Sequence, residues 1–179
     1  VIVEIGSFLG RSTHYLATSL MNANKEDVKI YCIDTFEGSS EHANIKLPKD
    51  FMHMTRENLK FFVGRNMVNL CQGRSDSKKI LDKFADESVD YIMVDGAHEY
   101  EPVRDDVINW WPKLKKDGVM FGDDVQLTSV LEGMKAGLRN KKMPSYGTNN
   151  GIEQTWYCTK NGDNQGYEKL IPGVNVLHE

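Results

Sequence analysis

Clustered acidic residues are the part of this chain most suited to chemistry. Asp95 follows an apolar run at residues 89–94, and Asp123 and Asp124 follow another at residues 119–121. If both runs are parallel strands, their carboxyl ends share one edge of a sheet, and three carboxylates lie close together. Such like charges raise one another's pKa unless a cation intervenes. We therefore predict that Asp95, Asp123 and Asp124 bind a divalent cation, Mg²⁺ or alternatively Mn²⁺ or Ca²⁺.

A histidine lies beside these acids in the sequence. His98 comes three residues after Asp95, and an imidazole that titrates near neutrality can accept a proton during a reaction. We predict that His98 is a general base. Two plainer readings stay open: His98 is a solvent-facing loop residue, and Asp124 caps the helix that follows it.

A second site is indicated near the start of the chain. Glycines at positions 6 and 10 follow a short apolar run that contains Glu4, and they allow a ligand to approach the backbone closely. Their spacing differs from the dinucleotide-binding fingerprint, which has glycines at relative positions one, three and six. Asp34 ends the next apolar run and is placed to accept hydrogen bonds from ribose hydroxyls. Glu4 would repel a pyrophosphate but suits a cationic ligand. The alternative is that the glycines only form a tight turn.

The elements that must position these residues alternate between strand and helix. Such alternation predicts an α/β, Rossmann-like, doubly wound and mostly parallel sheet. The expected strands are 1–5, 28–33, 68–71, 89–94 and 119–121, and the expected helices are 12–22, 51–63, 77–84, 103–114 and 127–139. Residues 152–158 alternate like a half-exposed strand and are predicted to form an antiparallel edge. A further short strand is expected near residues 173–177.

Length and composition limit the possible classes of protein. A chain of 179 residues with a net charge of −4 is expected to form a single domain, 1–179, and not to bind nucleic acid or an anionic membrane surface. No apolar run approaches the roughly 18 residues of a membrane span. Three widely spaced cysteines predict free buried thiols and a cytoplasmic location. Because the sequence opens in a strand and without Met, we expect that the given sequence lacks an N-terminal segment of the protein.

The combined motifs resemble those of class I S-adenosylmethionine-dependent methyltransferases. More narrowly, they are similar to the metal-dependent O-methyltransferase branch that contains macrocin-type sugar O-methyltransferases and cephalosporin-hydroxylase-like proteins. The motifs are Asp-Gly-Ala-His-Glu-Tyr at 95–100, Trp-Trp at 110–111 and Gly-Asp-Asp at 122–124. Catechol-type relatives carry lysine at the position of His98, and this difference favours a sugar or another aliphatic hydroxyl as the acceptor. The resemblance implies cofactor contacts at Glu4, Gly6, Ser7, Gly10, Ser12, Asp34, Thr35, Gly73, Ser75 and Asp95.

The predicted function is thus transfer of a methyl group from S-adenosylmethionine to a small-molecule hydroxyl, assisted by a divalent cation. Two alternatives remain. One is a cofactor-binding relative that does not transfer methyl groups, and the other is a nicotinamide-dependent oxidoreductase. The glycine spacing and Glu4 disfavour the oxidoreductase, and the acids with His98 disfavour the binding-only protein. A homodimer is the expected assembly.

Overall fold

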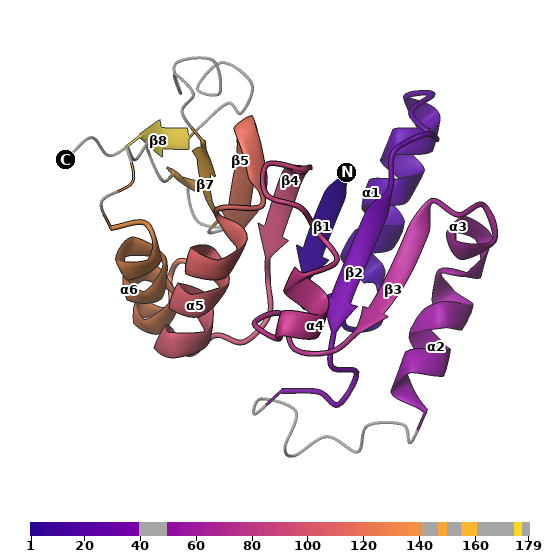
Figure 1. The fold of residues 1–179 in the computed structure, drawn as a ribbon, viewed down its shortest axis with the longest axis horizontal. Helices are drawn as coiled ribbons and strands as arrows, with labels where there is room; N and C mark the ends of the chain where they lie inside the picture. The colour runs from indigo at the N-terminus through magenta and orange to yellow at the C-terminus, as the bar shows by residue number, and fades with distance from the viewer. Residues whose placement is uncertain (40–49, 140, 142–146, 150–154, 161–173, 177–179) are drawn as a thin grey trace.

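The computed structural model describes residues 1–39, 50–139, 141, 147–149, 155–160 and 174–176 (Figure 1). Within these ranges strands and helices alternate as the sequence predicts. The strands are β1 Ile2–Ile5, β2 Ile30–Asp34, β3 Val68–Gln72, β4 Val89–Val94, β5 Leu114–Gly122, β6 Gly147–Asn149, β7 Trp156–Thr159 and β8 Val174–Val176. The helices are α1 Arg11–Asn22, α2 Phe51–Asn58, α3 Lys60–Gly64, α4 Lys78–Leu81, α5 Tyr100–Trp110 and α6 Thr128–Gly137.

Six strands form one sheet in the order β3-β2-β1-β4-β5-β7. The strands β1 to β5 pair in parallel, and β7 pairs antiparallel with β5 at the edge. This arrangement confirms the predicted fold class. The strand order reverses between β1 and β4, and such a reversal opens a crevice at the carboxyl ends of the strands. In Figure 1 the arrowheads of β1, β2, β3 and β4 point to the same lower edge.

Helices cover both faces of this sheet, and each face has its own apolar core. One core joins Ile2, Ile30, Cys32 and Val68 of the sheet to Ala17 of α1, Leu59 and Phe62. The other joins strand residues such as Val3, Ile92 and Met120 to Ile80 of α4, Val107 and Trp110 of α5, and Met134 of α6. Because neighbouring strand residues alternate between the two cores, the strands are buried on both sides, as a doubly wound sheet requires.

Several predicted helix boundaries are wrong: the helix expected over residues 77–84 spans only Lys78–Leu81, and α5 begins at Tyr100 instead of residue 103. Two further differences are larger. The helix expected over residues 103–114 ends at Trp110, and Leu114 begins β5 instead. Leu114 is fully buried and pairs with Val89 in the sheet. The helix expected over residues 51–63 is divided at Leu59 into α2 and α3. At Leu114 tertiary packing in the sheet overrides the helical pattern.

The edge strand β7 matches part of the predicted strand 152–158, whose residues 152–154 lie outside the described residues. The predicted C-terminal strand corresponds to β8, which pairs with β6 in a separate two-stranded sheet. The strand β6 was not predicted. Cys32, Cys71 and Cys158 are buried free thiols, as predicted. Of the helices in the described part of the chain, none has the length and apolar composition needed to cross a bilayer.

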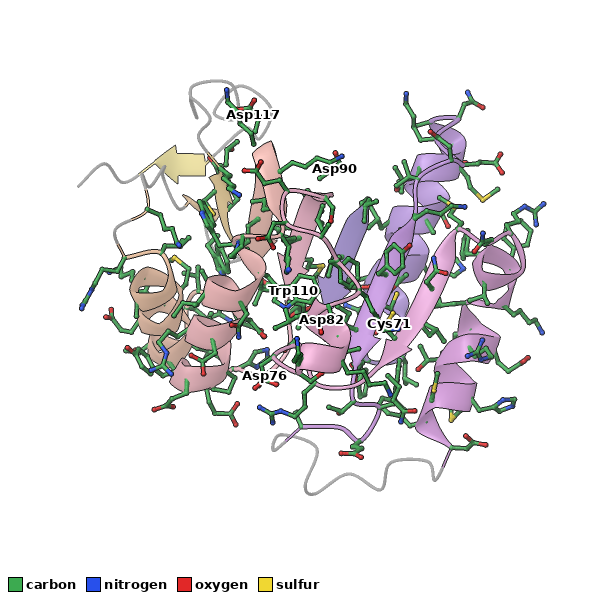
Figure 2. All side chains as sticks on the ribbon, in the orientation of Figure 1. Cys71, Asp76, Asp82, Asp90, Trp110 and Asp117 are labelled. Carbon is green, nitrogen blue, oxygen red and sulfur yellow. The ribbon has the colours of Figure 1, made fainter. Side chains whose placement is uncertain are left out.

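Acidic side chains occur at both edges of the sheet. Figure 2 shows Asp90 and Asp117 at the edge opposite to Asp76, which follows β3. Asp90 forms an ion pair with Lys115 at 2.7 Å between Oδ1 and Nζ. An acidic residue near a strand end is therefore not by itself a mark of the functional site, and the site must be identified from geometry.

Candidate functional site

A cavity of about 470 Å³ lies at the carboxyl ends of β1, β2, β3 and β4. It is bordered by the turn after β1, the tip of β2, the loop after β3 and the loop after β4. This position is the crevice that the strand order predicts. Of the ten predicted cofactor residues, six line the cavity: Gly6, Asp34, Thr35, Gly73, Ser75 and Asp95. Glu4, Ser7, Gly10 and Ser12 do not belong to the lining.

The turn between β1 and α1 depends on glycine. Gly6 has φ of 87°, and a Cβ atom there would lie 1.9 Å from the backbone oxygen of Asp95. Gly10 also has a positive φ, and a Cβ atom there would lie 2.6 Å from Leu59. The turn is therefore tight, as the alternative interpretation predicted, in which the glycines only form a tight turn. At Gly6 it also crosses the tip of β4 and borders the cavity.

Glu4 supports this turn from inside the protein. Its side chain is 1% exposed, and its two carboxylate oxygens accept hydrogen bonds from the hydroxyls of Ser12 and Thr13 in α1. Burial raises the pKa of Glu4. The sequence reasoning expected Glu4 to face a cationic ligand, whereas the structure places its carboxylate against α1.

Asp34 lies at the tip of β2 and borders the cavity. Its carboxylate accepts backbone hydrogen bonds from Phe8 at 2.8 Å and from Phe36 at 2.7 Å. The two bonds use different carboxylate oxygens, and together they fix the orientation of the Asp34 carboxylate. Because a carboxylate has about four acceptor positions, Asp34 keeps capacity to accept hydrogen bonds from a pair of hydroxyls.

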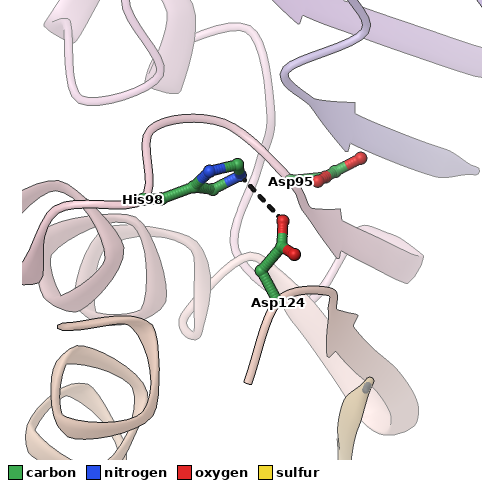
Figure 3. A group of neighbouring side chains, drawn as sticks. All are labelled: Asp95, His98 and Asp124. Carbon is green, nitrogen blue, oxygen red and sulfur yellow. Dashed lines mark ion pairs between the residues drawn. The ribbon is translucent and has the colours of Figure 1, made fainter. Parts of the chain in front are cut away.

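Three side chains from two loops converge at the other end of the cavity (Figure 3). They are Asp95 and His98, which follow β4, and Asp124, which follows β5. One possible ligand atom from each lies within 4.8 Å of the other two. His98 Nε2 lies 3.1 Å from Asp124 Oδ2, and both side chains are partly buried. The loop histidine is thus paired with a carboxylate rather than simply facing solvent.

Asp123 has a different position from the one expected. Its Oδ1 accepts a hydrogen bond from the backbone N–H of Asp124 at 2.9 Å. The group of potential ligands in the described residues contains His98 in place of Asp123. The helix-capping alternative for Asp124 is wrong, because the N-cap of α6 is Leu127.

The predicted crowding of negative charge is present. Burial raises the pKa of Asp95 to about 7, and the nearby charge of Asp123 adds to this rise. The charges of Glu4 and Asp124 act in the same direction, and His98 acts against them. An environment of this kind is relieved by a positive charge.

Sequence reasoning missed several residues of the cavity lining, and the buried Asp106 is one of them. It lies on α5, is 5% exposed, and borders the cavity. Its buried neighbours on the helix are Val103, Val107 and Trp110. The signal was present in the sequence, since an aspartate in the apolar stripe of a helix is costly to bury without a partner.

Two curated proteins are similar to this chain. One is the "Uncharacterized protein y4gI" of Sinorhizobium fredii (strain NBRC 101917 / NGR234), 28% identical over 126 residues, or 70% of this chain. The other is the "Uncharacterized protein R132" of Acanthamoeba polyphaga mimivirus, 29% identical over 127 residues, or 69% of this chain. The alignments span 13% and 51% of these relatives, so the chain corresponds to only a part of each.

A solved structure shares the fold. It is CalS11, described as a TDP-rhamnose 3'-O-methyltransferase in calicheamicin biosynthesis, with a TM-score of 0.69 and 18% identity. The similarity covers 90% of this chain and 72% of that one.

A family model described as "Methyltransferase domain" matches residues 3–125, from the first strand to the residue after Asp124. The match includes the cavity, the glycine turn and the group formed by Asp95, His98 and Asp124. It confirms the resemblance to S-adenosylmethionine-dependent methyltransferases that the motifs indicate. The chain belongs to this methyltransferase domain family.

Proposed function

We propose that the protein transfers a methyl group from S-adenosylmethionine to a hydroxyl of a small molecule, and that a divalent cation assists the transfer. One observation carries this proposal: a single cavity has Asp34 at one end and Asp95 with His98 at the other. Within this one ligand-sized space Asp34 would accept hydrogen bonds from ribose hydroxyls, and His98 would accept a proton.

The cavity fits the cofactor in size and chemistry. Its volume of about 470 Å³ lies within the range of roughly 300–1,000 Å³ that is usual for small-molecule sites. Asp34 would accept the ribose hydroxyls, and the absence of a side chain at Gly6 leaves room beside the tip of β4. The bound cofactor would supply a methyl group on a sulfonium, which is already electrophilic.

The residues also fit a divalent cation. Two carboxylates and an imidazole are suitable ligands. Burial and, after it, nearby negative charge raise the pKa of Asp95, and a cation would offset that charge. Asp95 and Asp124 would hold the ion, while Asp123 would contribute charge from nearby. A bound cation would lower the pKa of an aliphatic hydroxyl and stabilise its oxyanion.

His98 would take the proton that the hydroxyl loses. Asp124, 3.1 Å away, would orient the imidazole and stabilise the imidazolium that forms. The same geometry also favours His98 as a third metal ligand. His98→Ala separates the two roles: loss of a base lowers turnover by about 10²–10⁴ and leaves Mn²⁺ affinity unchanged, whereas loss of a ligand weakens Mn²⁺ binding. The exposed His53 supplies the control variant His53→Ala.

The acceptor we propose is a sugar or a natural product with an aliphatic hydroxyl. His98, at the position where catechol-type relatives carry lysine, supports this class. So does the description of CalS11 as a methyltransferase of a nucleotide-linked sugar.

The decisive experiment measures methyl transfer to a panel of such hydroxyl compounds, with Mg²⁺ or Mn²⁺ and with EDTA. We expect turnover that EDTA removes and added cation restores. Turnover that is indifferent to EDTA would remove the metal from the proposal.

Calorimetric titrations with S-adenosylhomocysteine and with NAD accompany the turnover assay and measure which cofactor binds. Cofactor binding without any turnover would favour the binding-only alternative, and binding of NAD alone would favour the oxidoreductase.

We further propose a single domain that acts in the cytoplasm as a homodimer. Three buried free thiols support a reducing compartment. Light scattering at several protein concentrations tests the dimer, and a constant monomer mass would contradict it.

A further inference from the structure

Two residues hold the carboxylate of Asp34, and both have an uncommon backbone conformation. The N–H groups of Phe8 and Phe36 donate to its two oxygens at 2.8 and 2.7 Å. Phe8 has φ of 47° and Phe36 has φ of 57°, and both values belong to the left-handed region. Bulky residues seldom adopt this region, because it is costly for any residue that has a Cβ atom. The surrounding structure must therefore hold both residues in place.

The helix α2 supplies part of that support through one aromatic ring. The ring centroid of Phe51, the first residue of α2, lies 5.0 Å from that of Phe8 and 6.2 Å from that of Phe36. Both contacts are edge-to-face, a geometry that aromatic pairs favour. Phe51 is buried. One buried side chain thus packs against both of the residues whose N–H groups orient Asp34.

A buried hydroxyl of α2 holds Phe8 a second time. Thr55 lies one helical turn after Phe51 and therefore shares its face of α2. Its Oγ1 donates to the backbone oxygen of Phe8 at 2.8 Å and lies farther, at 3.2 Å, from the backbone oxygen of Phe51. Thr55 fixes the peptide that follows the Cα atom of Phe8, and Asp34 fixes the peptide that precedes it. Together the two bonds hold Phe8 in the left-handed conformation.

The end of α2 holds the next residues of the glycine turn. Asn58 Nδ2 donates to the backbone oxygen of Leu9 at 3.0 Å. The side chain of Leu59 occupies the space beside Gly10. The second half of the turn is therefore fixed against α2 by hydrogen bonds and by packing.

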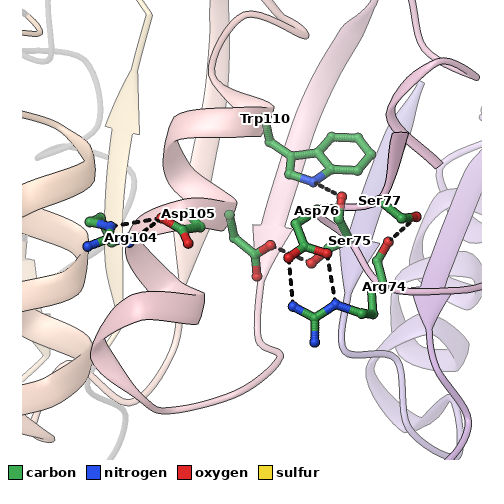
Figure 4. A network of polar contacts seen from close by, with 8 residues as sticks. Arg74, Ser75, Asp76, Ser77, Arg104, Asp105 and Trp110 are labelled. Atoms are coloured by element: carbon green, nitrogen blue, oxygen red, sulfur yellow. Dashed lines mark hydrogen bonds and ion pairs between the residues drawn. The ribbon is translucent and has the colours of Figure 1, made fainter. Parts of the chain in front are cut away.

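The loop after β3 borders the same cavity, but a different helix supports it. Trp110 Nε1 of α5 donates to the backbone oxygen of Ser75 at 3.2 Å (Figure 4). The hydroxyl of Ser75 donates to Asp106 of the same helix. The helices α2 and α5 thus fix different borders of the cavity. A change in α2 should consequently act on Asp34 and spare the loop after β3.

We propose that Phe51 and Thr55 are positioning residues for the cofactor, which hold Phe8 and Phe36 so that Asp34 faces the ribose hydroxyls. This inference rests on the proposed function, in which Asp34 accepts hydrogen bonds from the ribose. Phe51 and Thr55 do not belong to the cavity lining. They act on the ligand through the backbone N–H groups that orient Asp34, so α2 sets the selectivity for ribose over deoxyribose.

Calorimetric titration of the whole chain with S-adenosylhomocysteine and with its 2′-deoxyribose analogue tests this inference without any need for turnover. The analogue lacks one hydroxyl that Asp34 would accept, so we expect the wild type to prefer the ribose ligand by about 10- to 100-fold. Thr55→Val keeps the shape of the side chain and removes the hydroxyl. It should reduce that preference by about 3- to 10-fold, because it weakens binding of the ribose ligand and leaves the affinity for the analogue nearly unchanged.

Four further variants make the comparison specific. Thr55→Ser restores the hydroxyl and should keep the wild-type preference. Thr159→Val removes the hydroxyl of another buried threonine, in the edge strand β7, and should also keep it. Phe51→Leu loses both ring contacts and should lower the preference as Thr55→Val does. In an Asp34→Ala background, Thr55→Val should not change the preference further, because the carboxylate that it positions is gone.

The possible results distinguish failure of this inference from failure of the proposed function. If the wild type binds neither ligand, both are overturned. If the wild type binds the two ligands equally, the ribose role of Asp34 and this inference are overturned, whereas cofactor binding stands. If the wild type prefers the ribose ligand and Thr55→Val keeps that preference, only the inference is overturned. Equal weakening of both ligands by Thr55→Val would also overturn it, because α2 would then support the cavity as a whole.

Discussion

Replacing Asp106 by Asn is expected to stabilise the ligand-free protein more at pH 8 than at pH 5. Burial raises the pKa of Asp106 from 3.8 to about 7, partly offset by the hydrogen bond from Ser75. Between these two values the folded protein binds more protons at this carboxyl than the unfolded chain does. Stability contributed by Asp106 therefore falls as the pH rises from about 4 to about 7. Asn keeps the shape and can accept from Ser75, but it carries no charge.

The magnitude follows from the shift. A complete change from 3.8 to about 7 corresponds to about 4 kcal/mol of unfolding free energy. Part of this loss of unfolding free energy has already occurred at pH 5, so the loss between pH 5 and pH 8 is about 2–3 kcal/mol. The free energy of unfolding of Asp106→Asn, minus that of the wild type, should rise by this amount over the interval. Asp95, whose pKa is also raised to about 7, titrates in both proteins and cancels in the difference.

Urea denaturation followed by tryptophan fluorescence at pH 5, 6, 7 and 8 measures this difference. Asp105→Asn, with its side chain 42% exposed, is the control and should not reproduce the rise. A difference between Asp106→Asn and wild type that stays constant from pH 5 to pH 8 would refute the reasoning. So would a variant that loses more stability at pH 8 than at pH 5.

Three further predictions concern the glycine turn and the two ends of the cavity. Gly6→Ala should destabilise the protein by about 3 kcal/mol or more in thermal unfolding, since its φ is positive and its Cβ would lie 1.9 Å from a backbone oxygen. Gly64→Ala is the control, because nothing lies within 4 Å of its Cβ, and equal losses would contradict the steric argument. Asp34→Ala should weaken S-adenosylhomocysteine binding about 10-fold or more in calorimetry; unchanged affinity would exclude the ribose role. Asp124→Ala should abolish the thermal stabilisation by Mn²⁺, whereas Asp123→Ala should retain it, and the reverse order would restore the grouping expected from sequence.

Hydrophobic patterning predicted the sheet because buried parallel strands are continuous apolar runs. The run at residues 89–94 became β4 with the same bounds. Residues 111–118 were harder, because Leu114 fits the apolar spacing of the preceding helix equally well. Its pairing with Val89 in the sheet decides the matter. That contact joins segments 25 residues apart in the sequence, so a local pattern could not reveal it.

At the cofactor end of the site, the sequence predicted which residues lie near the ends of the strands, but not the direction of each side chain. Asp34 borders the cavity as expected, since its position depends only on the end of β2. Glu4 shows the limit of this reasoning. It also lies in the last part of a strand, but its carboxylate faces the hydroxyls of Ser12 and Thr13. Successive residues of a strand point to opposite faces, and the sequence did not indicate which face the helix α1 covers.

The acidic end of the site shows why spacing placed the acids at one edge but did not distinguish the positions of their side chains. Asp123 and Asp124 are adjacent, so their side chains leave the backbone in different directions. Asp124 has φ of 59°, a left-handed conformation that aspartate adopts more readily than most residues. This turn brings its carboxylate to His98, while Asp123 accepts the N–H of Asp124 itself. Because of this one backbone angle, the carboxylates of the two neighbouring aspartates have different partners.

If the left-handed conformation orients Asp124, then Asp124→Asn, which tolerates this angle, should preserve the local fold and weaken Mn²⁺ binding only through the lost charge. Asp124→Val, which disfavours the angle, should lower stability as well, and equal stability of the two variants would show that the angle is not what orients the ligand.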